Sequence, residues 1–191
     1  MCLFDTLFVV VVPLPIRLEF SPPIDPTMEE ELCQQLSEAG RIVSRMQQTP
    51  DSTIAALLKR LKQNLSDLEK DEVRELIKRE IMTALEVGGI PGTFSRHFTM
   101  VFVNLSMTNI ELLKANRNES IVLCLECQSL ESLWKLRDMI VSGRLLRLLS
   151  EAVKDFIKSR PRVQLIVKRE DFNLCLAYFN RAEGMRKAEL L

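Results

Sequence analysis

The sequence predicts an α+β fold: an antiparallel sheet of about four strands, backed by helices on one face and preceded by a helical N-terminal segment. Apolar residues recur with the helical period of about 3.6 up to residue 87, and with the strand period of about 2 in several stretches after residue 96. The chain has enough apolar material for a core, since 47% of its 191 residues are hydrophobic and 27% are charged.

These patterns divide the chain into three segments: an apolar, proline-rich extension over 1–27, a helical segment over 28–92 and an α+β sandwich over 93–191. The apolar run Phe8–Val12 in the extension is too short to span a bilayer, which takes about 20 residues. It also lacks the basic residues that begin a signal peptide. We therefore interpret the extension as a strand or an unattached segment, and we expect no membrane insertion.

The helical segment contains three predicted helices. The first spans about 28–48 and places its leucine, isoleucine and valine side chains on one stripe. A second begins after Ser52, which has the position of an N-cap. The third begins at Ser66, because Ser66 and Glu69 have the spacing of a capping box. Each helix is expected to bury one face.

The α+β segment alternates between strand and helix patterns. We predict strands over His97–Leu105, Ile110–Ala115, Ser120–Cys127 and Arg162–Arg169. Predicted helices follow Ser129, Gly143 and Asp171. The first of these strands has apolar residues on both of its faces.

No set of residues in the sequence predicts catalysis. His97 is the single histidine and has no nucleophile motif near it. Cys124 and Cys127 stand three apart on a predicted strand, so their thiols point to opposite faces and cannot share a metal. We therefore predict a non-enzymatic protein without metal or cofactor. The five cysteines are scattered and odd in number, which fits a reducing compartment such as the cytoplasm.

The predicted sheet has apolar residues on the face opposite its helices. We take Met100, Phe102, Val122 and Ile166 as candidate partner-binding residues on this face, because exposed apolar patches usually mark protein contacts. The sequence leaves open whether a partner or the chain's own helices over 28–87 cover the face. In either case, the prediction requires His97–Leu105 to be a strand.

Part of the chain resembles the N-terminal domain of the TRADD family of death-receptor adaptors and its invertebrate immune relatives. The resemblance covers about 97–180 and rests on the apolar strand Ser120–Cys127, the Leu-rich helices Leu130–Leu149 with their Ser142-Gly143 break, and the alternating strand Arg162–Lys168. It implies an antiparallel sheet backed by helices and a first-strand aromatic position that Phe102 would fill. The vertebrate domain has a helical stretch between its first two strands, whereas here only residues 106–108 separate the predicted ones. The sequence leaves open whether the helices over 28–87 take that place or the chain belongs to a divergent branch. It also implies an adaptor function in intracellular death-receptor or innate-immune signalling, with a TRAF-type adaptor as partner.

A second interpretation is a ferredoxin-like RNA-binding domain with an accessory helical region. Its strands would carry Phe98 and Phe102 for base stacking, beside basic residues at 162, 168 and 169. However, 26 basic side chains balance 26 acidic ones, and no RNP-type string is present. We therefore expect protein partners and no nucleic acid.

Overall fold

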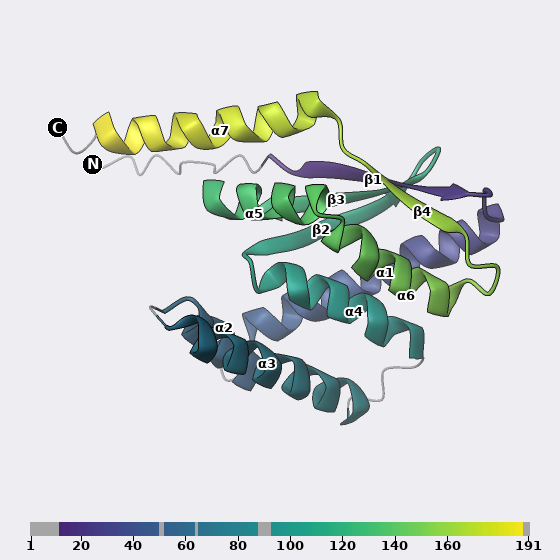
Figure 1. Ribbon diagram of the computed structural model, residues 1–191, viewed down its shortest axis with the longest axis horizontal. Coiled ribbons are helices and arrows are strands. Elements are labelled where there is room, and N and C mark those ends of the chain that lie inside the picture. The colour runs from purple at the N-terminus through teal and green to yellow at the C-terminus, as the bar shows by residue number, and fades with distance from the viewer. Residues whose placement is uncertain (1–11, 50–51, 64, 88–92, 189–191) are drawn as a thin grey trace, which may run out of the picture.

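The computed structural model describes residues 12–49, 52–63, 65–87 and 93–188. Four strands form one antiparallel sheet in the order β2-β3-β1-β4 (Figure 1). Some helices pack directly on the sheet, and the α2–α3 pair lies farther from it. In chain order the elements are β1 (Leu14–Ser21), α1 (Pro26–Gln48), α2 (Thr53–Leu61), α3 (Asp67–Val87), α4 (Thr93–Ser106), β2 (Ile110–Arg117), β3 (Ile121–Cys127), α5 (Leu130–Val141), α6 (Arg144–Phe156), β4 (Arg162–Ile166) and α7 (Arg169–Ala188).

The connections between the strands give the sheet a ferredoxin-like arrangement. Helices α1 to α4 link β1 to β2, a short turn links β2 to β3, and helices α5 and α6 link β3 to β4. With each helical stretch counted as one crossover, the order is β-α-β-β-α-β, the split βαβ motif. The predicted α+β class and four-stranded antiparallel sheet are therefore confirmed. The predicted helical start is not confirmed, because the strand β1 comes before the helices α1 to α3.

That first strand lies at the centre of the sheet. Leu14, Ile16 and Leu18 are at most 1% exposed, and the residues between them point to the opposite face. β1 pairs with β3 on one side and with β4 on the other. The boundary predicted after residue 27 therefore separates a central strand from the rest of its own sheet, and the three-segment division does not describe the packing.

Residues 97–105 form most of helix α4 and not a strand, which corrects a central expectation. Phe98, Val101, Phe102, Val103 and Leu105 are all at most 2% exposed. α4 packs against α1, α6, α3 and β2, so nearly its whole circumference is buried. A helix that is apolar on all sides has no polar face to reveal its period, and it resembles a strand with two apolar faces.

Helices α1, α4 and α6 form a layer on one face of the sheet. α1 packs along β2, and Gly40 permits the close approach. A Cβ atom at Gly40 would lie 2.6 Å from Cδ2 of Leu112 on β2. Phe102 of α4 reaches the same place, where it lines a small cavity with Gly40 and Leu112. Phe98 of α4 contacts Phe156 of α6 edge to face, with ring centroids 6.1 Å apart.

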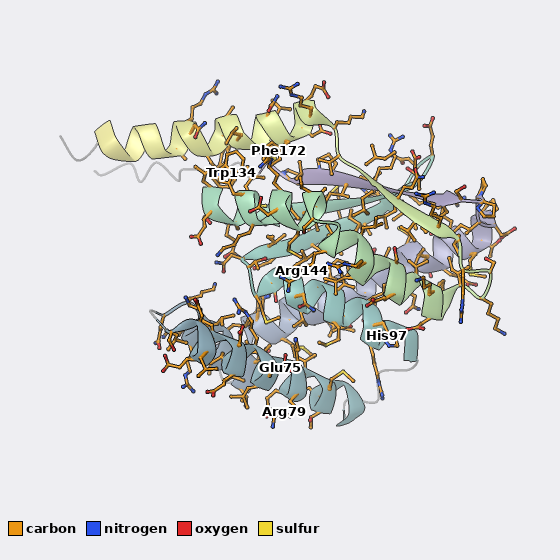
Figure 2. All side chains as sticks on the ribbon, in the orientation of Figure 1. Glu75, Arg79, His97, Trp134, Arg144 and Phe172 are labelled. Carbon is orange, nitrogen blue, oxygen red and sulfur yellow. The ribbon has the colours of Figure 1, made fainter. Side chains whose placement is uncertain are left out.

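Helix α7 leaves the sheet and lies beside α5. Trp134 of α5 and Phe172 of α7 meet edge to face at 5.7 Å between ring centroids, and Figure 2 shows the two helices side by side there. The Arg137 guanidinium lies over the Trp134 ring at 5.4 Å. The Cys175 thiol of α7 donates to the main-chain oxygen of Val12, which fixes α7 beside the residues that precede β1.

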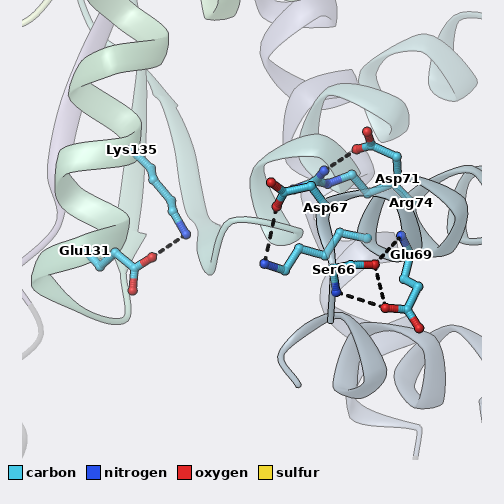
Figure 3. Close-up of polar contacts among 8 residues, drawn as sticks. Ser66, Asp67, Glu69, Asp71, Arg74, Glu131 and Lys135 are labelled. Carbon is cyan, nitrogen blue, oxygen red and sulfur yellow. Dashed lines mark hydrogen bonds and ion pairs between the residues drawn. The ribbon is translucent and has the colours of Figure 1, made fainter. Parts of the chain in front are cut away.

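Helices α2 and α3 form a hairpin that packs on α1 and α4, away from the sheet. The predicted capping box at its second helix is confirmed. The main-chain N–H of Glu69 donates to the Ser66 hydroxyl at 3.4 Å, and the N–H of Ser66 donates to the Glu69 carboxylate at 2.9 Å (Figure 3). The Ser66 hydroxyl also donates to the Glu69 carboxylate at 2.6 Å, and this bond, together with the one from the Ser66 N–H, holds the pKa of Glu69 below its usual value. None of the described helices is long and apolar enough to cross a bilayer.

Candidate protein-interaction surface

One row of side chains crosses all four strands on the face away from α1, α4 and α6. Asn116 of β2 lies opposite Val122 of β3, Val122 opposite Arg17 of β1, and Arg17 opposite Ile166 of β4. Residues directly opposite in neighbouring strands point to the same face. Ile166 is 38% exposed, and Val122 and Arg17 are half-buried. We call these four residues the open row.

The structure brings together only half of the predicted partner-binding set. Val122 and Ile166 lie in the open row, separated by Arg17. Phe102 is 2% exposed within α4, on the covered side of the sheet, and Met100 lies half-buried on the same helix. They therefore share no surface with Val122 and Ile166. A Phe102→Asp variant would report on the stability of the core and not on docking.

Arg17 is the residue of this surface that sequence reasoning missed. Its guanidinium forms no ion pair with any residue that the structure describes. A signal was present, because Arg17 stands among the alternating apolar residues of β1. The prolines on both sides of β1 concealed that signal, since they suggested an extension outside the fold.

A shallow hollow adjoins the open row where β1 ends. Arg17, Glu19, Glu119 and Ser120 are among the residues that line it. Ser120 is 8% exposed, and its hydroxyl oxygen has no hydrogen-bond partner among the described residues. With Glu29 of α1, which also lines it, the hollow combines one guanidinium, three carboxylates and a buried hydroxyl.

Charged side chains lie on all four strands of this face. Glu111 of β2 lies opposite Glu126 of β3 at one corner, and burial together with the Glu111 carboxylate raises the pKa of Glu126. Arg17 and Arg162 lie toward the other side, on β1 and β4. Lys114 of β2 and Glu19 of β1 lie on the same face, so this surface carries charges of both signs and the acidic pair is confined to one corner.

The residues considered for chemistry do not assemble into a reactive site. Cys124 points to the open face and Cys127 to the covered face, as predicted for positions three apart. Burial raises the pKa of the Cys127 thiol to about 12, so it stays protonated near neutral pH. Nδ1 of His97 lies 3.3 Å from Asp155, with both side chains about half exposed. Among the described residues no group of three or more could hold a metal ion.

Comparisons of the chain with protein-family models, with curated proteins and with solved structures found no match.

Proposed function

We propose that this chain is a non-enzymatic protein-interaction module that serves as an adaptor in intracellular death-receptor or innate-immune signalling. The open row carries the proposal. It presents an exposed isoleucine, a half-buried valine and an arginine that has no ion partner among the described residues, on a sheet whose helical layer covers the other face. Apolar groups beside an unpaired guanidinium are typical of the centre of protein interfaces.

The order of the elements supports the adaptor assignment. TRADD N-terminal domains have a helical stretch between their first two strands, and here α1 to α4 occupy that place, with β1 lying outside the residues over which the resemblance was drawn. The resemblance also implies a Leu-rich helix pair before an alternating strand, which corresponds to α5, α6 and β4. Because a fold hosts many functions, this agreement supports the adaptor role only as an analogy. We propose a TRAF-type adaptor as the partner.

The cytoplasm is the location that we propose for this interaction. Cys33, Cys124, Cys127 and Cys175 are free thiols in the structure and all are buried. Free thiols are usual in reducing compartments.

The aromatic residues that the RNA-binding alternative requires for base stacking do not lie on the open face. Phe98 and Phe102 belong to the core of α4, and the residues of β1 and β3 that point to the open face include no aromatic ring. Base stacking on a sheet of this topology needs aromatic side chains on that face. A protein partner is therefore the better proposal for this surface.

Calorimetry with the purified full chain and a purified TRAF-type adaptor tests the proposal. We expect saturable binding that Ile166→Asp weakens by about tenfold or more, because a carboxylate would enter the apolar part of the contact. Leu68→Asp is the matched control, since Leu68 is 73% exposed on α3 and lies on a different surface.

The control should bind as the unchanged chain does. Equal loss in both variants would exclude the open row as the contact. An absence of binding to every TRAF-type adaptor would exclude the proposed partner class, and binding of a single-stranded RNA at the open row would favour the alternative.

A further inference from the structure

We propose that the outer edge of β4 accepts an extended acidic segment of a partner protein as a fifth strand of the sheet. This inference rests on the proposed function and specifies its partner. β4 is the last strand in the order, and no described strand pairs with its outer side. Three features carry the inference: the direction of its main-chain groups, the absence of a bulge and of a covering segment along its edge among the described residues, and the charge around it.

The hydrogen-bond direction can be followed from β2 across the sheet. The N–H of Gln128 donates to the oxygen of Asn109 at 3.1 Å, so these residues form a hydrogen-bonded pair just before the β2–β3 ladder. Hydrogen-bonded and non-hydrogen-bonded pairs alternate in antiparallel sheets. Glu126, Cys124 and Val122 therefore direct their main-chain N–H and C=O groups to β2. The alternate residues of β3, which are Leu125, Leu123 and Ile121, direct their N–H and C=O groups to β1.

The same alternation continues across β1. Leu14, Ile16 and Leu18 of β1 lie opposite the β3 residues that direct their main-chain groups to β1. The N–H and C=O groups of these three β1 residues therefore point to β3. Pro15 and Arg17 consequently face the other side, where Pro15 needs no donor because β4 pairs only from Arg17 onward.

The alternation ends at β4 with two outward residues. Ile166 lies opposite Arg17 and Gln164 opposite Glu19, so both bond to β1. Val163 and Leu165 lie between these positions and direct their N–H and C=O groups outward. No hydrogen bond of the described residues uses these outward groups. They form a short template for another strand.

The protection of the β4 edge is limited to the short length of the strand and to the cations around it. The strand has no bulge and no proline within Arg162–Ile166, and α6 packs on its face. Natural sheets normally cover such an edge or bend it. The exposed side chain of Ile166 adds apolar surface beside the template.

The charge around β4 selects the occupant. Residues 156–169 include no acidic residue. The basic residues there are all exposed and form no ion pair among the described residues: Lys158, Arg160, Arg162, Lys168 and Arg169. Pairing with β4 of a second copy would bring two such sets of cations together. An acidic strand would instead neutralise both ends of β4.

A synthetic peptide can test this occupant directly. The probe is a fluorescent peptide with the sequence Glu-Glu-Val-Thr-Val-Glu-Glu, which presents the same groups in either strand direction. We expect saturable binding to the full chain that weakens about tenfold or more in the double variant Arg162→Glu, Lys168→Glu. The control double variant is Arg60→Glu, Lys62→Glu, which changes the net charge equally at exposed positions on the α2–α3 hairpin.

Strand addition is distinguished from simple charge attraction by the main chain of the peptide. The same peptide, N-methylated at its three central residues, keeps its charge and loses donors, so it should not bind. Equal binding of the methylated peptide would overturn the inference, as would an absence of binding. Stronger competition by an oligouridylate than by the acidic peptide would also overturn it and indicate a nucleic-acid surface.

The two proposals fail in different ways. If the peptide does not bind but TRAF-type adaptor binding remains sensitive to Ile166→Asp, strand addition alone is wrong. If the peptide binds as expected but no adaptor does, the proposed adaptor function alone is wrong.

Discussion

The two edges of the sheet are built differently, although both belong to one antiparallel sheet. At the β2 edge, the register shifts between Leu112 and Lys114, and α1 packs along the strand so closely that Gly40 touches Leu112. Arg117 at the end of β2 bonds Glu29 and Glu30 of α1. In the part of the chain that the structure describes, the β4 edge has no bulge, no helix along its outer side, and a group of cations without ion pairs. The β2 edge is therefore closed to other strands by the fold itself, whereas the main-chain groups of the β4 edge are available to a partner.

The largest expected effect is the difference in stability between a variant in the core beside β2 and a variant at the exposed side chain on β4. Phe102→Ala should lower the free energy of unfolding by about 3–5 kcal/mol, because it leaves a cavity among α1, α4 and β2. Ile166→Ala should cost less than about 1 kcal/mol, because Ile166 is already 38% exposed. Urea unfolding of the two variants measures the difference. Similar losses would mean that Ile166 belongs to the core and not to an interaction surface.

The close contact between α1 and β2 provides a second test. Gly40→Val should lower the free energy of unfolding by about 1–3 kcal/mol, because the new side chain would overlap Leu112. Glu31→Val is the control at an exposed position of the same helix, and it should change stability little. If Gly40→Val is neutral, α1 does not hold the β2 edge through this contact. The measurement is again urea unfolding at constant pH.

Amide hydrogen exchange tests the direction of the β4 main chain without any substitution. The amides of Val163 and Leu165 should exchange about tenfold or more faster than those of Gln164 and Ile166, which bond to β1. NMR of the deuterated chain resolves the four amides. The reverse alternation would mean that the outward groups belong to Gln164 and Ile166. Binding of the acidic peptide should slow the exchange of the outward pair.

The smallest effect is expected at the far end of β2. Arg117→Gln removes the guanidinium that bonds Glu29 and Glu30, at a position exposed to solvent. Screening by water and salt makes such pairs weak, so we expect a slight fall in Tm that disappears at high salt. A fall larger than that of Gly40→Val would show that charge, and not close packing, protects this edge.

Much of the fold could be predicted because several segments have a clean period. The pattern Ser120–Cys127 and the break at Ser142-Gly143 correctly indicated β3 and the α5–α6 pair. α4 was misread because it is apolar all round, and its burial depends on neighbours that a local pattern does not contain. That single error moved Met100 and Phe102 from the core to a surface.

The candidate site was only half predictable for a related reason. Val122 and Ile166 are three-dimensional neighbours of Arg17, but β1 is distant from both in the sequence. Which main-chain groups of β4 point outward depends on the pairing of all four strands, and no local pattern carries that information. The basic residues around β4 were visible in the sequence, but their meaning depends on the strand being an edge.

The position of β1 at the centre of the sheet also has a consequence for biosynthesis. Leu14 finds its partner at Leu125, and Leu18 finds its second partner at Leu165. A ribosome releases these residues long after β1, so the nascent chain holds a strand of alternating leucine and isoleucine that nothing yet pairs. Topologies dominated by such distant contacts fold slowly, so the sheet of this protein can form only after β3 and β4 have emerged.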